Sequence, residues 1–208
     1  MSRYVYLLDP GHGGILDGKY QTKGKRSPFI PTHPEGAVVY EGIFNRTIVS
    51  LVKDMCIKND IEVVNLVDTQ EDVPLSQRVR KANLIHKENR RSIYISIHAN
   101  AYGDGSSFNS ARGVSTFYHI NSRNGKKLAK VMQENLVKET GLKDRGAIAN
   151  KTWANFYVLR KTHMPAILTE NGFMTNYREA CLMLTEEFQQ QVADAHFNTI
   201  MHFEKQGL

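Results

Sequence analysis

The chain has 208 residues, of which 41% are hydrophobic and 23% are charged, and its formal net charge is +6. This composition excludes a disordered chain, a collagen-like repeat and a coiled coil, and the length favours a single domain, spanning 1–208, with one sizeable core. The modest excess of Lys and Arg suits a polyanionic partner such as nucleic acid or an acidic cell surface, but it selects neither.

No membrane insertion is expected, because no apolar run approaches the roughly 18 residues of a membrane helix. The start of the chain, Met1-Ser2-Arg3, leads directly into an apolar run without the h-region of a signal peptide. We therefore expect no export signal, although a form whose leader has been removed fits the same sequence. Cys56 and Cys181 lie in apolar periodic stretches, which indicates buried hydrophobic residues rather than a disulfide framework.

The first half of the chain alternates between predicted strands and helices. An apolar, β-branched run at residues 4–8 predicts a buried strand, and similar runs follow at residues 61–67 and 92–97. Apolar stripes at helical spacing predict helices that include Phe44 to Met55 and Leu75 to Ile85.

The second half continues this pattern with weaker strand signals. Predicted strands cover residues 113–119, 155–160 and 166–169. Helices are predicted around Leu128 to Leu136, with a C-cap near Gly141, around a capping box of Asn176 and Glu179, and from Thr185 to Phe203. The alternation predicts an α/β fold, a mostly parallel twisted sheet of about six strands with helices on both faces.

Two segments lack periodicity and are predicted to be loops. Residues 14–36 are rich in Gly and Pro and contain the basic cluster 19–26, and residues 101–112 form a shorter loop rich in Gly and Ser. A loop as long as 14–36 within a compact domain is usually functional or mobile. The basic cluster could line a groove for an anionic polymer or could simply be a solvated surface.

Two histidines follow predicted core strands. His12 stands in Asp-Pro-Gly-His-Gly-Gly after the first strand, and His98 stands in Ser-Ile-His-Ala-Asn at the end of the third. Ligands of open α/β sheets bind beyond the carboxyl ends of strands, and neutral imidazole is the commonest metal ligand. A Gly-rich turn with an incidental His, a phosphate cradle and structural imidazoles remain alternatives at this point.

Two glutamates could complete a catalytic metal site. Glu41 opens the helix after the long loop and could supply the third ligand of a His₂Glu zinc set, or it could serve the helix dipole alone. Glu170 closes an apolar strand, where it could act as general base and acid or be a solvated strand end.

These motifs together resemble those of the zinc-dependent N-acetylmuramoyl-L-alanine amidases of the Amidase_3 family. The resemblance spans nearly the whole chain and rests on the following segments: Asp-Pro-Gly-His-Gly-Gly (9–14), Glu41 with Asn45, Leu75-x-x-Arg78 with Ala82-Asn83, Ser-Ile-His-Ala-Asn (96–100), Arg145-Gly146, Val-Leu-Arg (158–160) and Pro-Ala-Ile-Leu-Thr-Glu-Asn-Gly-Phe-Met-Thr-Asn (165–176).

The resemblance implies that His12, Glu41 and His98 bind one Zn²⁺ per chain and that Glu170 is the catalytic acid/base. The implied reaction is hydrolysis of the amide between N-acetylmuramic acid and the L-alanine of the peptidoglycan stem peptide. Asn100 and Arg145 are candidate substrate contacts. Asp9 is a nearby residue that could orient a metal-bound imidazole.

The resemblance also shapes expectations about context. Because the loop 101–112 is too short for the helical insertion that covers zinc in some members, we expect no obligate protein activator. We expect a monomer that binds peptidoglycan, no nucleic acid, no appended wall-binding domain, and action on the cell wall as an endolysin or as an autolysin of the host. The alternatives are a zinc peptidase that cuts within the stem peptide and a noncatalytic peptidoglycan-binding module.

Overall fold

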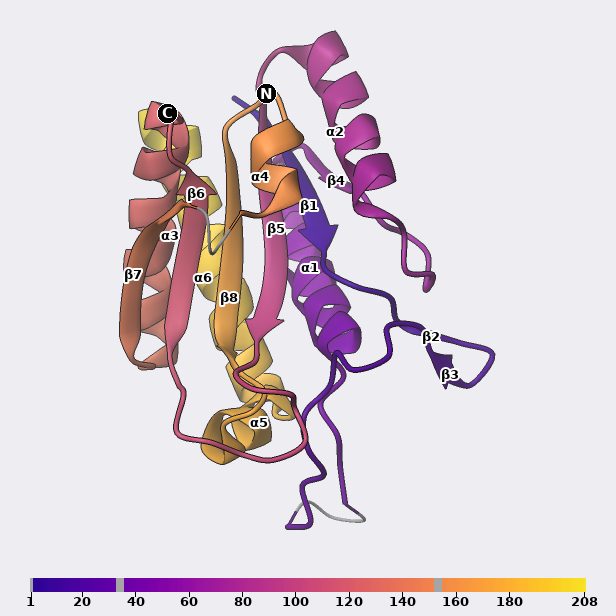
Figure 1. The fold of residues 1–208 in the computed structure, drawn as a ribbon. Helices are drawn as coiled ribbons and strands as arrows, with labels where there is room; N and C mark the ends of the chain where they lie inside the picture. Colours follow the sequence, from indigo (N-terminus) through magenta and orange to yellow (C-terminus); the bar gives the residue numbers. More distant parts are fainter. Residues whose placement is uncertain (1, 33–35, 152–154) are drawn as a thin grey trace.

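The computed structural model describes residues 2–32, 36–151 and 155–208. Its centre is a six-stranded sheet in the order β4-β1-β5-β8-β6-β7 (Figure 1). The strands are β1 (Val5–Pro10), β4 (Val63–Asn65), β5 (Ser92–Asn100), β6 (Val114–His119), β7 (Asp144–Asn150) and β8 (Ala166–Phe173). The first three of these and β8 run parallel, whereas β6 pairs antiparallel with β8 and parallel with β7.

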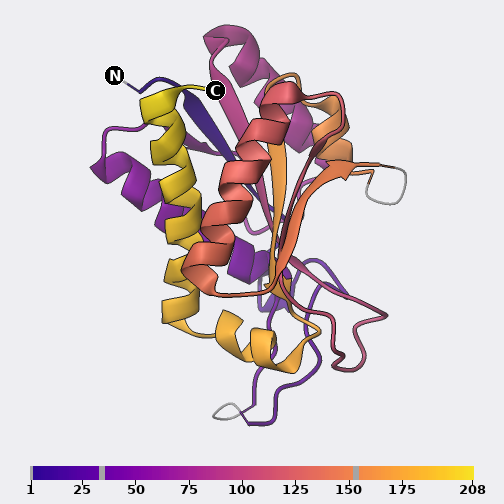
Figure 2. The ribbon, with the colours of Figure 1, turned by 90° about the vertical axis from the view of Figure 1, so that its left-hand side faces the viewer.

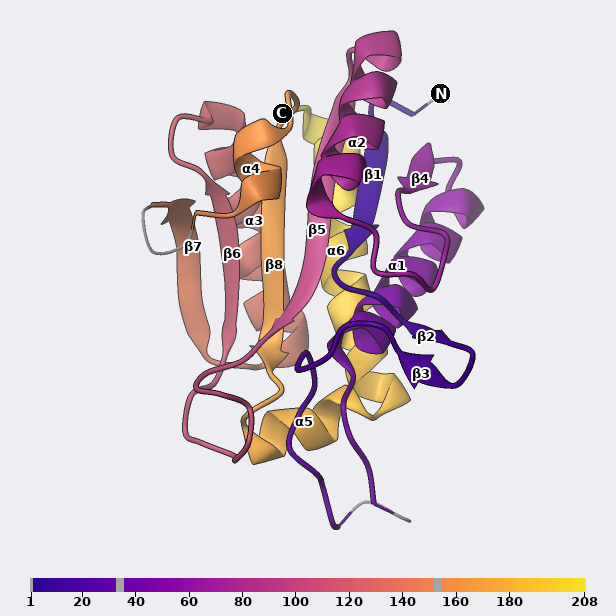
Figure 3. The same ribbon diagram turned by 45° about the vertical axis from the view of Figure 1, so that its right-hand side comes forward.

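Helices cover both faces of the sheet. One face is covered by α1 (Glu41–Lys58), α3 (Arg123–Thr140) and α6 (Glu186–Gln206), and the other by α2 (Leu75–Asn89) and α4 (Tyr157–Lys161). Figure 3 shows α2 and α4 in front of the sheet with α3 and α6 behind it, and Figure 2 shows the α3 and α6 side. The short helix α5 (Tyr177–Met183) follows the carboxyl end of β8. The predicted fold class is therefore confirmed.

The burial pattern explains why the sheet forms here. All six residues of β1 and the first six of β5 are buried, because alternate side chains pack against helices on opposite faces. Tyr6, Leu8 and Ile95 belong to the core beneath α1 and α6, and Leu7 and Tyr94 belong to the core beneath α2 and α4.

Most of the predicted helix ends are confirmed by the capping residues in the structure. Gly141 ends α3 in the left-handed conformation at φ 63°, and the Thr185 side chain caps α6 by accepting a hydrogen bond from the Phe188 amide. Asn176 likewise caps α5. Glu179, however, does not complete the capping box; its carboxylate accepts hydrogen bonds from the Gly113 and Phe173 amides instead.

Two strand predictions need correction. The segment predicted as a strand at 155–160 forms helix α4, because Val158 and Leu159 pack into the α2-side core from one helical turn. Strand β7 was not predicted, because this half-exposed edge strand contains Gly146 and polar residues rather than an apolar run. The sheet still has six strands, since β7 replaces the strand expected at 155–160.

The predicted long loop is partly ordered. It begins with a hairpin of two short strands, β2 (Ile15–Leu16) and β3 (Lys19–Tyr20), and bridges join Arg26 to Tyr40 and Ile30 to Ala37. Residues 33–35 of that loop lie outside the described residues. The described parts of the loop therefore pair with each other before α1 begins.

The two cysteines are free, with Cys56 buried and Cys181 partly buried. Within the described ranges, each helix is either too short or too polar to cross a bilayer.

Candidate metal centre

His12 lies in the turn that leaves the carboxyl end of β1. Its backbone adopts the left-handed conformation, φ 65°, and its carbonyl oxygen accepts a hydrogen bond of 2.7 Å from the Arg46 guanidinium. The preceding Gly11 has no room for a side chain, because an added Cβ would lie 2.1 Å from Cε1 of His98. The glycine therefore allows the turn to pass directly against the second imidazole.

Glu41 is the first residue of α1, and only 2% of it is exposed. Its amide donates to the Lys25 carbonyl at 3.0 Å, which ties the long loop to the start of the helix. A Cβ at the next residue, Gly42, would meet the Gly13 carbonyl oxygen at 1.8 Å. Because Gly42 has no side chain, the start of α1 packs directly against the turn after β1, and the Glu41 carboxylate lies beside His12.

The carboxylate of Glu41 bridges the two imidazoles. Its Oε1 lies 3.1 Å from His98 Nδ1, and its Oε2 lies 3.3 Å from His12 Nε2. The imidazole rings stand nearly perpendicular, with centroids 5.2 Å apart. Burial raises the pKa of Glu41, but the hydrogen bonds with the two histidines outweigh this effect and hold the pKa below its usual range. Glu41 is therefore an anion.

This arrangement fits a zinc ion. One donor atom from each of the three residues lies within 4.8 Å of the others. Tetrahedral zinc holds N and O ligands at about 2.0–2.1 Å, which places ligand atoms roughly 3.3 Å apart. The two His–Glu separations match that spacing, and two imidazoles with one carboxylate are a donor set that zinc favours. The three predicted ligands are brought together.

A hydrogen-bonded chain orients His98 from behind. Ser96 Oγ donates to Asp9 Oδ2 at 3.1 Å, so it can accept a hydrogen bond from His98 Nε2, 3.2 Å away. With the ring proton on Nε2, the Nδ1 lone pair is available to a metal ion; with the proton on Nδ1, this atom donates to Glu41 Oε1. A metal-ligating imidazole is usually held by such a contact.

Asp9 is itself fixed by a buried ion pair. Arg78 Nη1 lies 2.6 Å from Asp9 Oδ1, and each side chain is 1% exposed. The same guanidinium donates to the His12 carbonyl at 3.2 Å, and the Tyr94 hydroxyl donates to Asp9. Burial raises the pKa of Tyr94 well above its usual range, as does the nearby carboxylate, so the phenol stays protonated. Arg78 therefore supports both histidine segments.

Glu170 faces the same pocket from β8. It is the register partner of His98, so the parallel pairing of β5 and β8 sets it beside the metal ligands. Its Oε2 atom is buried and has no hydrogen-bond partner within the described part of the chain. Burial raises the pKa of Glu170 well above its usual range, the Glu41 carboxylate raises it further, and Lys25 opposes both effects. Two carboxyl groups thus share one site with opposite pKa shifts.

The pocket that contains these groups has a volume of about 310 Å³. Besides the three ligands and Glu170, its walls include Lys25 from the long loop and apolar side chains. These apolar residues are Leu75, Phe156, Val158, Leu168 and Met174. The apolar walls keep the local dielectric low, which strengthens the electrostatic interactions within the pocket.

The two candidate substrate contacts lie in different places. Asn100 lines the pocket, although its side chain also accepts a hydrogen bond from the Ala101 amide at 2.8 Å. Arg145 lies in a separate hollow of about 750 Å³ with Tyr102 and Arg112, and its guanidinium lies over the Phe173 ring at 4.9 Å. Arg145 is therefore not brought to the metal ligands.

Three supporting residues were not assigned individual roles from the sequence. Arg78 and Ser96 occur within recognised motifs, but only the folded arrangement shows that they hold Asp9, His12 and His98. Lys25 stood in a basic cluster whose role was left open.

Comparisons with known proteins show which family the chain is similar to. Residues 7–202 match the family Amidase_3, described as N-acetylmuramoyl-L-alanine amidase. The chain is 32% identical over 198 residues to the endolysin of Bacillus phage SPP1, covering 94% of this chain and 64% of that protein. It is 31% identical over 202 residues to the uncharacterized protein YqiI of Bacillus subtilis, covering 94% of this chain and 82% of that protein.

Solved structures with the same fold include two amidases. An N-acetylmuramoyl-L-alanine amidase from Clostridium difficile 630 superposes with a TM-score of 0.78 at 29% identity, covering 99% of both chains. The catalytic domain of CwlV, an N-acetylmuramoyl-L-alanine amidase from Bacillus (Paenibacillus) polymyxa, gives a TM-score of 0.75 at 28% identity, covering 96% of this chain and 97% of that one.

Proposed function

The chain belongs to the N-acetylmuramoyl-L-alanine amidase family Amidase_3, and on that basis we propose that it hydrolyses the amide between N-acetylmuramic acid and L-alanine in peptidoglycan. The observation that carries this proposal is the grouping of His12, Glu41 and His98 beside the buried Glu170 in one pocket. The pKa of Glu41 is lowered and that of Glu170 is raised, and two carboxyl groups with opposite pKa shifts are typical of sites that perform acid and base chemistry.

We propose that His12 Nε2, His98 Nδ1 and the Glu41 carboxylate hold one Zn²⁺. When bound there, zinc supplies Lewis-acid chemistry, which polarises a substrate carbonyl and lowers the pKa of a water molecule to about 7. The Asp9–Ser96–His98 chain keeps the His98 lone pair directed to the ligand position. The anionic Glu41 offsets part of the metal's charge.

Glu170 is the proposed proton carrier. Its carboxylate accepts a proton from the attacking water, and the raised pKa then favours holding that proton until the departing nitrogen takes it. A carboxyl group with an ordinary pKa would release the proton to solvent more readily. Burial of Oε2 without another partner leaves this atom available for both transfers.

Substrate contacts follow from the pocket walls. We propose that Asn100 binds the substrate beside the scissile amide, because it lines the same pocket as Glu170. A contact from Arg145 requires a substrate that extends into the neighbouring hollow. Lys25 adds a positive charge at the pocket wall, which suits an anionic group of the stem peptide.

The place of action is the cell wall, as the name of the phage relative suggests for an endolysin-type enzyme. We propose that no protein activator is needed, because the loop 101–112, which is wholly described, contains no helix that could cover the metal ligands. Activity that appears only with an added wall protein would contradict this.

Product analysis of digested peptidoglycan tests the function. Wild-type protein should release intact stem peptides with a free N-terminal alanine, and a chelator should abolish this release. Glu170→Gln should retain bound metal but lose turnover by at least about a hundredfold, as expected for loss of a general acid/base. His12→Ala should lose the metal, and Glu134→Gln on the exposed side of α3 should match the wild type.

Other outcomes would identify the alternatives. New termini within the stem peptide would indicate a zinc peptidase. Sedimentation with peptidoglycan without any product, despite bound metal, would indicate a binding module. Full activity of Glu170→Gln would overturn the assignment of the acid/base.

A further inference from the structure

The positive charge of the chain is concentrated in three segments. Residues 73–91, 119–132 and 155–168 contain 12 of the 27 Lys and Arg residues but only 1 of the 21 Asp and Glu residues. The remaining chain carries 15 basic and 20 acidic residues, so it is net negative although the whole chain is net positive. Of the 12 basic residues, only Arg78 is buried; the other 11 are exposed.

The fold brings α2 beyond Val79, the end of α4 and the start of α3 to the end of the sheet opposite the metal centre, whereas Leu75 and Phe156 of the same segments line the metal pocket. Helix α2 runs toward the amino end of β5, the segment after α4 leads into the amino end of β8, and α3 begins just after the carboxyl end of the antiparallel strand β6 (Figures 1 and 3). The metal ligands and Glu170, by contrast, lie at the carboxyl ends of β1, β5 and β8.

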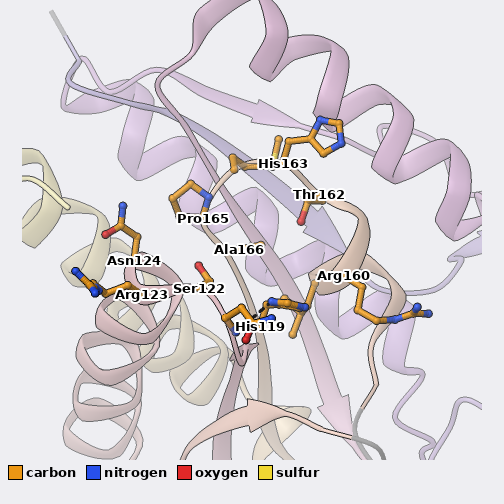
Figure 4. A pocket seen from close by; sticks show the side chains of 12 residues that line it. His119, Ser122, Arg123, Asn124, Arg160, Thr162, His163, Pro165 and Ala166 are labelled. Atoms are coloured by element: carbon orange, nitrogen blue, oxygen red, sulfur yellow. Dashed lines mark hydrogen bonds between the residues drawn. The ribbon is translucent and has the colours of Figure 1, made fainter.

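Two adjoining hollows form this surface. One, of about 640 Å³, is lined by His119, Arg123, Arg160 and His163 among others, and Figure 4 shows Arg123 at one rim with Arg160 and His163 at the opposite rim. The other, of about 580 Å³, is lined by Arg80, Lys87, Arg90 and again His163. His163 lines both hollows and therefore lies between them.

The basic surface is defined as Arg80, Lys87, Arg90, Arg123, Arg160 and His163, and among the described residues no carboxylate forms an ion pair with it. Neither hollow is lined by Asp or Glu within the described residues. The ion pairs recorded for the described chain involve none of these six side chains. Like charges gathered without counterions repel one another, so an anionic partner would relieve a repulsion already present in the fold.

We propose that the basic surface binds a polyol-phosphate polymer of the cell wall and so retains the enzyme on its substrate. A row of cations along two open hollows matches a chain of regularly spaced phosphates better than a single enclosed anion. This proposal rests on the proposed function, which brings the protein to the cell wall. Nucleic acid is disfavoured because no exposed Phe, Tyr or Trp stands among the described residues of the surface to stack with bases.

The test compares two variants with the same change in charge. Arg80→Gln/Lys87→Gln/Arg160→Gln neutralises the basic surface, and Lys53→Gln/Lys58→Gln/Lys205→Gln neutralises exposed residues of α1 and α6. Binding to purified poly(glycerol phosphate) is measured by calorimetry across a salt series. Binding to cell walls before and after chemical removal of their phosphate polymers is measured by sedimentation.

We expect the first variant to bind poly(glycerol phosphate) at least about tenfold more weakly at low salt, with a salt slope reduced by about two to three. The second variant should stay within about threefold of the wild type. Both should hydrolyse a short soluble muramyl peptide at the wild-type rate, because neither changes the pocket. Stripped walls should bind all three proteins equally weakly.

Three results would overturn the proposal. Equal losses in both variants would mean that only net charge matters, and no loss in the first would mean that the surface is not used. Tighter binding of a single-stranded oligonucleotide than of poly(glycerol phosphate), at equal phosphate concentration, would point to nucleic acid. Since poly(glycerol phosphate) contains no amide that the enzyme could cleave, failure of the amide-cleavage assay would refute the proposed function and not the surface.

Discussion

Replacing Arg78 by Met should destabilise the fold and weaken the metal site together. Both Arg78 and Asp9 are 1% exposed, and their charged atoms lie 2.6 Å apart. Met fills a similar elongated volume but removes the charge. The substitution leaves the Asp9 carboxylate buried beside Tyr94 and Ser96 without a cation, and it also removes the guanidinium contact to the His12 carbonyl.

The expected cost follows from that burial. Breaking a buried ion pair by removing one partner costs about 3–5 kcal/mol, because the remaining charge has lost its compensation. This is a large share of the roughly 5–15 kcal/mol that stabilises a typical domain. Zinc affinity should fall about 10–100-fold, as for other losses of groups that orient a ligating histidine, since Asp9 holds Ser96 and Ser96 holds His98.

Urea unfolding and zinc titration measure the two effects. Lys138→Met is the matched control, because it removes the same kind of charge from an ion pair with Glu139 whose Lys side chain is 74% exposed. That change should cost less than about 1 kcal/mol and leave zinc affinity unchanged. A loss below about 1 kcal/mol for Arg78→Met, or unaltered zinc affinity in a folded Arg78→Met protein, would refute the reasoning.

Three further predictions concern single residues. Burial lowers the pKa of His196 from 6.5 to about 4, so on acidification the unfolded chain takes up a proton before the folded chain does. The free energy of unfolding should therefore fall by about 3 kcal/mol between pH 6.5 and 4. In urea titrations across this pH range, His196→Gln should show a smaller fall. Gly11→Ala should reduce zinc content, measured by metal analysis, because the new Cβ would meet the His98 ring. Lys25→Met should shift the acidic limb of the pH–rate profile to higher pH, because a positive charge near Glu170 is lost, whereas Lys23→Met should not.

Much of the fold could be predicted because its strongest signals are local. The buried runs that became β1 and β5 and the stripe from Phe44 to Met55 each have one periodicity and one structural interpretation. The errors occurred where tertiary contacts decide. The segment 155–160 is apolar enough for either a strand or a helix, and β7 is stabilised mainly by pairing with β6 rather than by its own sequence.

The candidate metal ligands could be proposed because each lies near the carboxyl end of a strand or at the start of a helix, which is where α/β folds place functional groups. Their supporting residues could not be assigned roles, because those roles depend on long-range contacts. Arg78 is a residue of α2 whose side chain crosses to β1, and nothing in its neighbourhood along the chain indicates a partner 69 residues away. The roles of Ser96 and Lys25 likewise exist only in the folded arrangement.

Because β6 runs opposite to β8, the metal pocket and the basic surface lie at opposite ends of the sheet. If every strand ran parallel, all strand carboxyl ends would gather at the metal pocket, and α3 would begin there too. Because β6 runs antiparallel to β8, α3 begins at the far end, beside the basic surface. An eight-residue strand such as β8 spans about 26 Å. An enzyme bound through its basic surface would therefore reach amide bonds about one strand length from its point of attachment. It could cleave the bonds within that distance before it dissociates from the polymer.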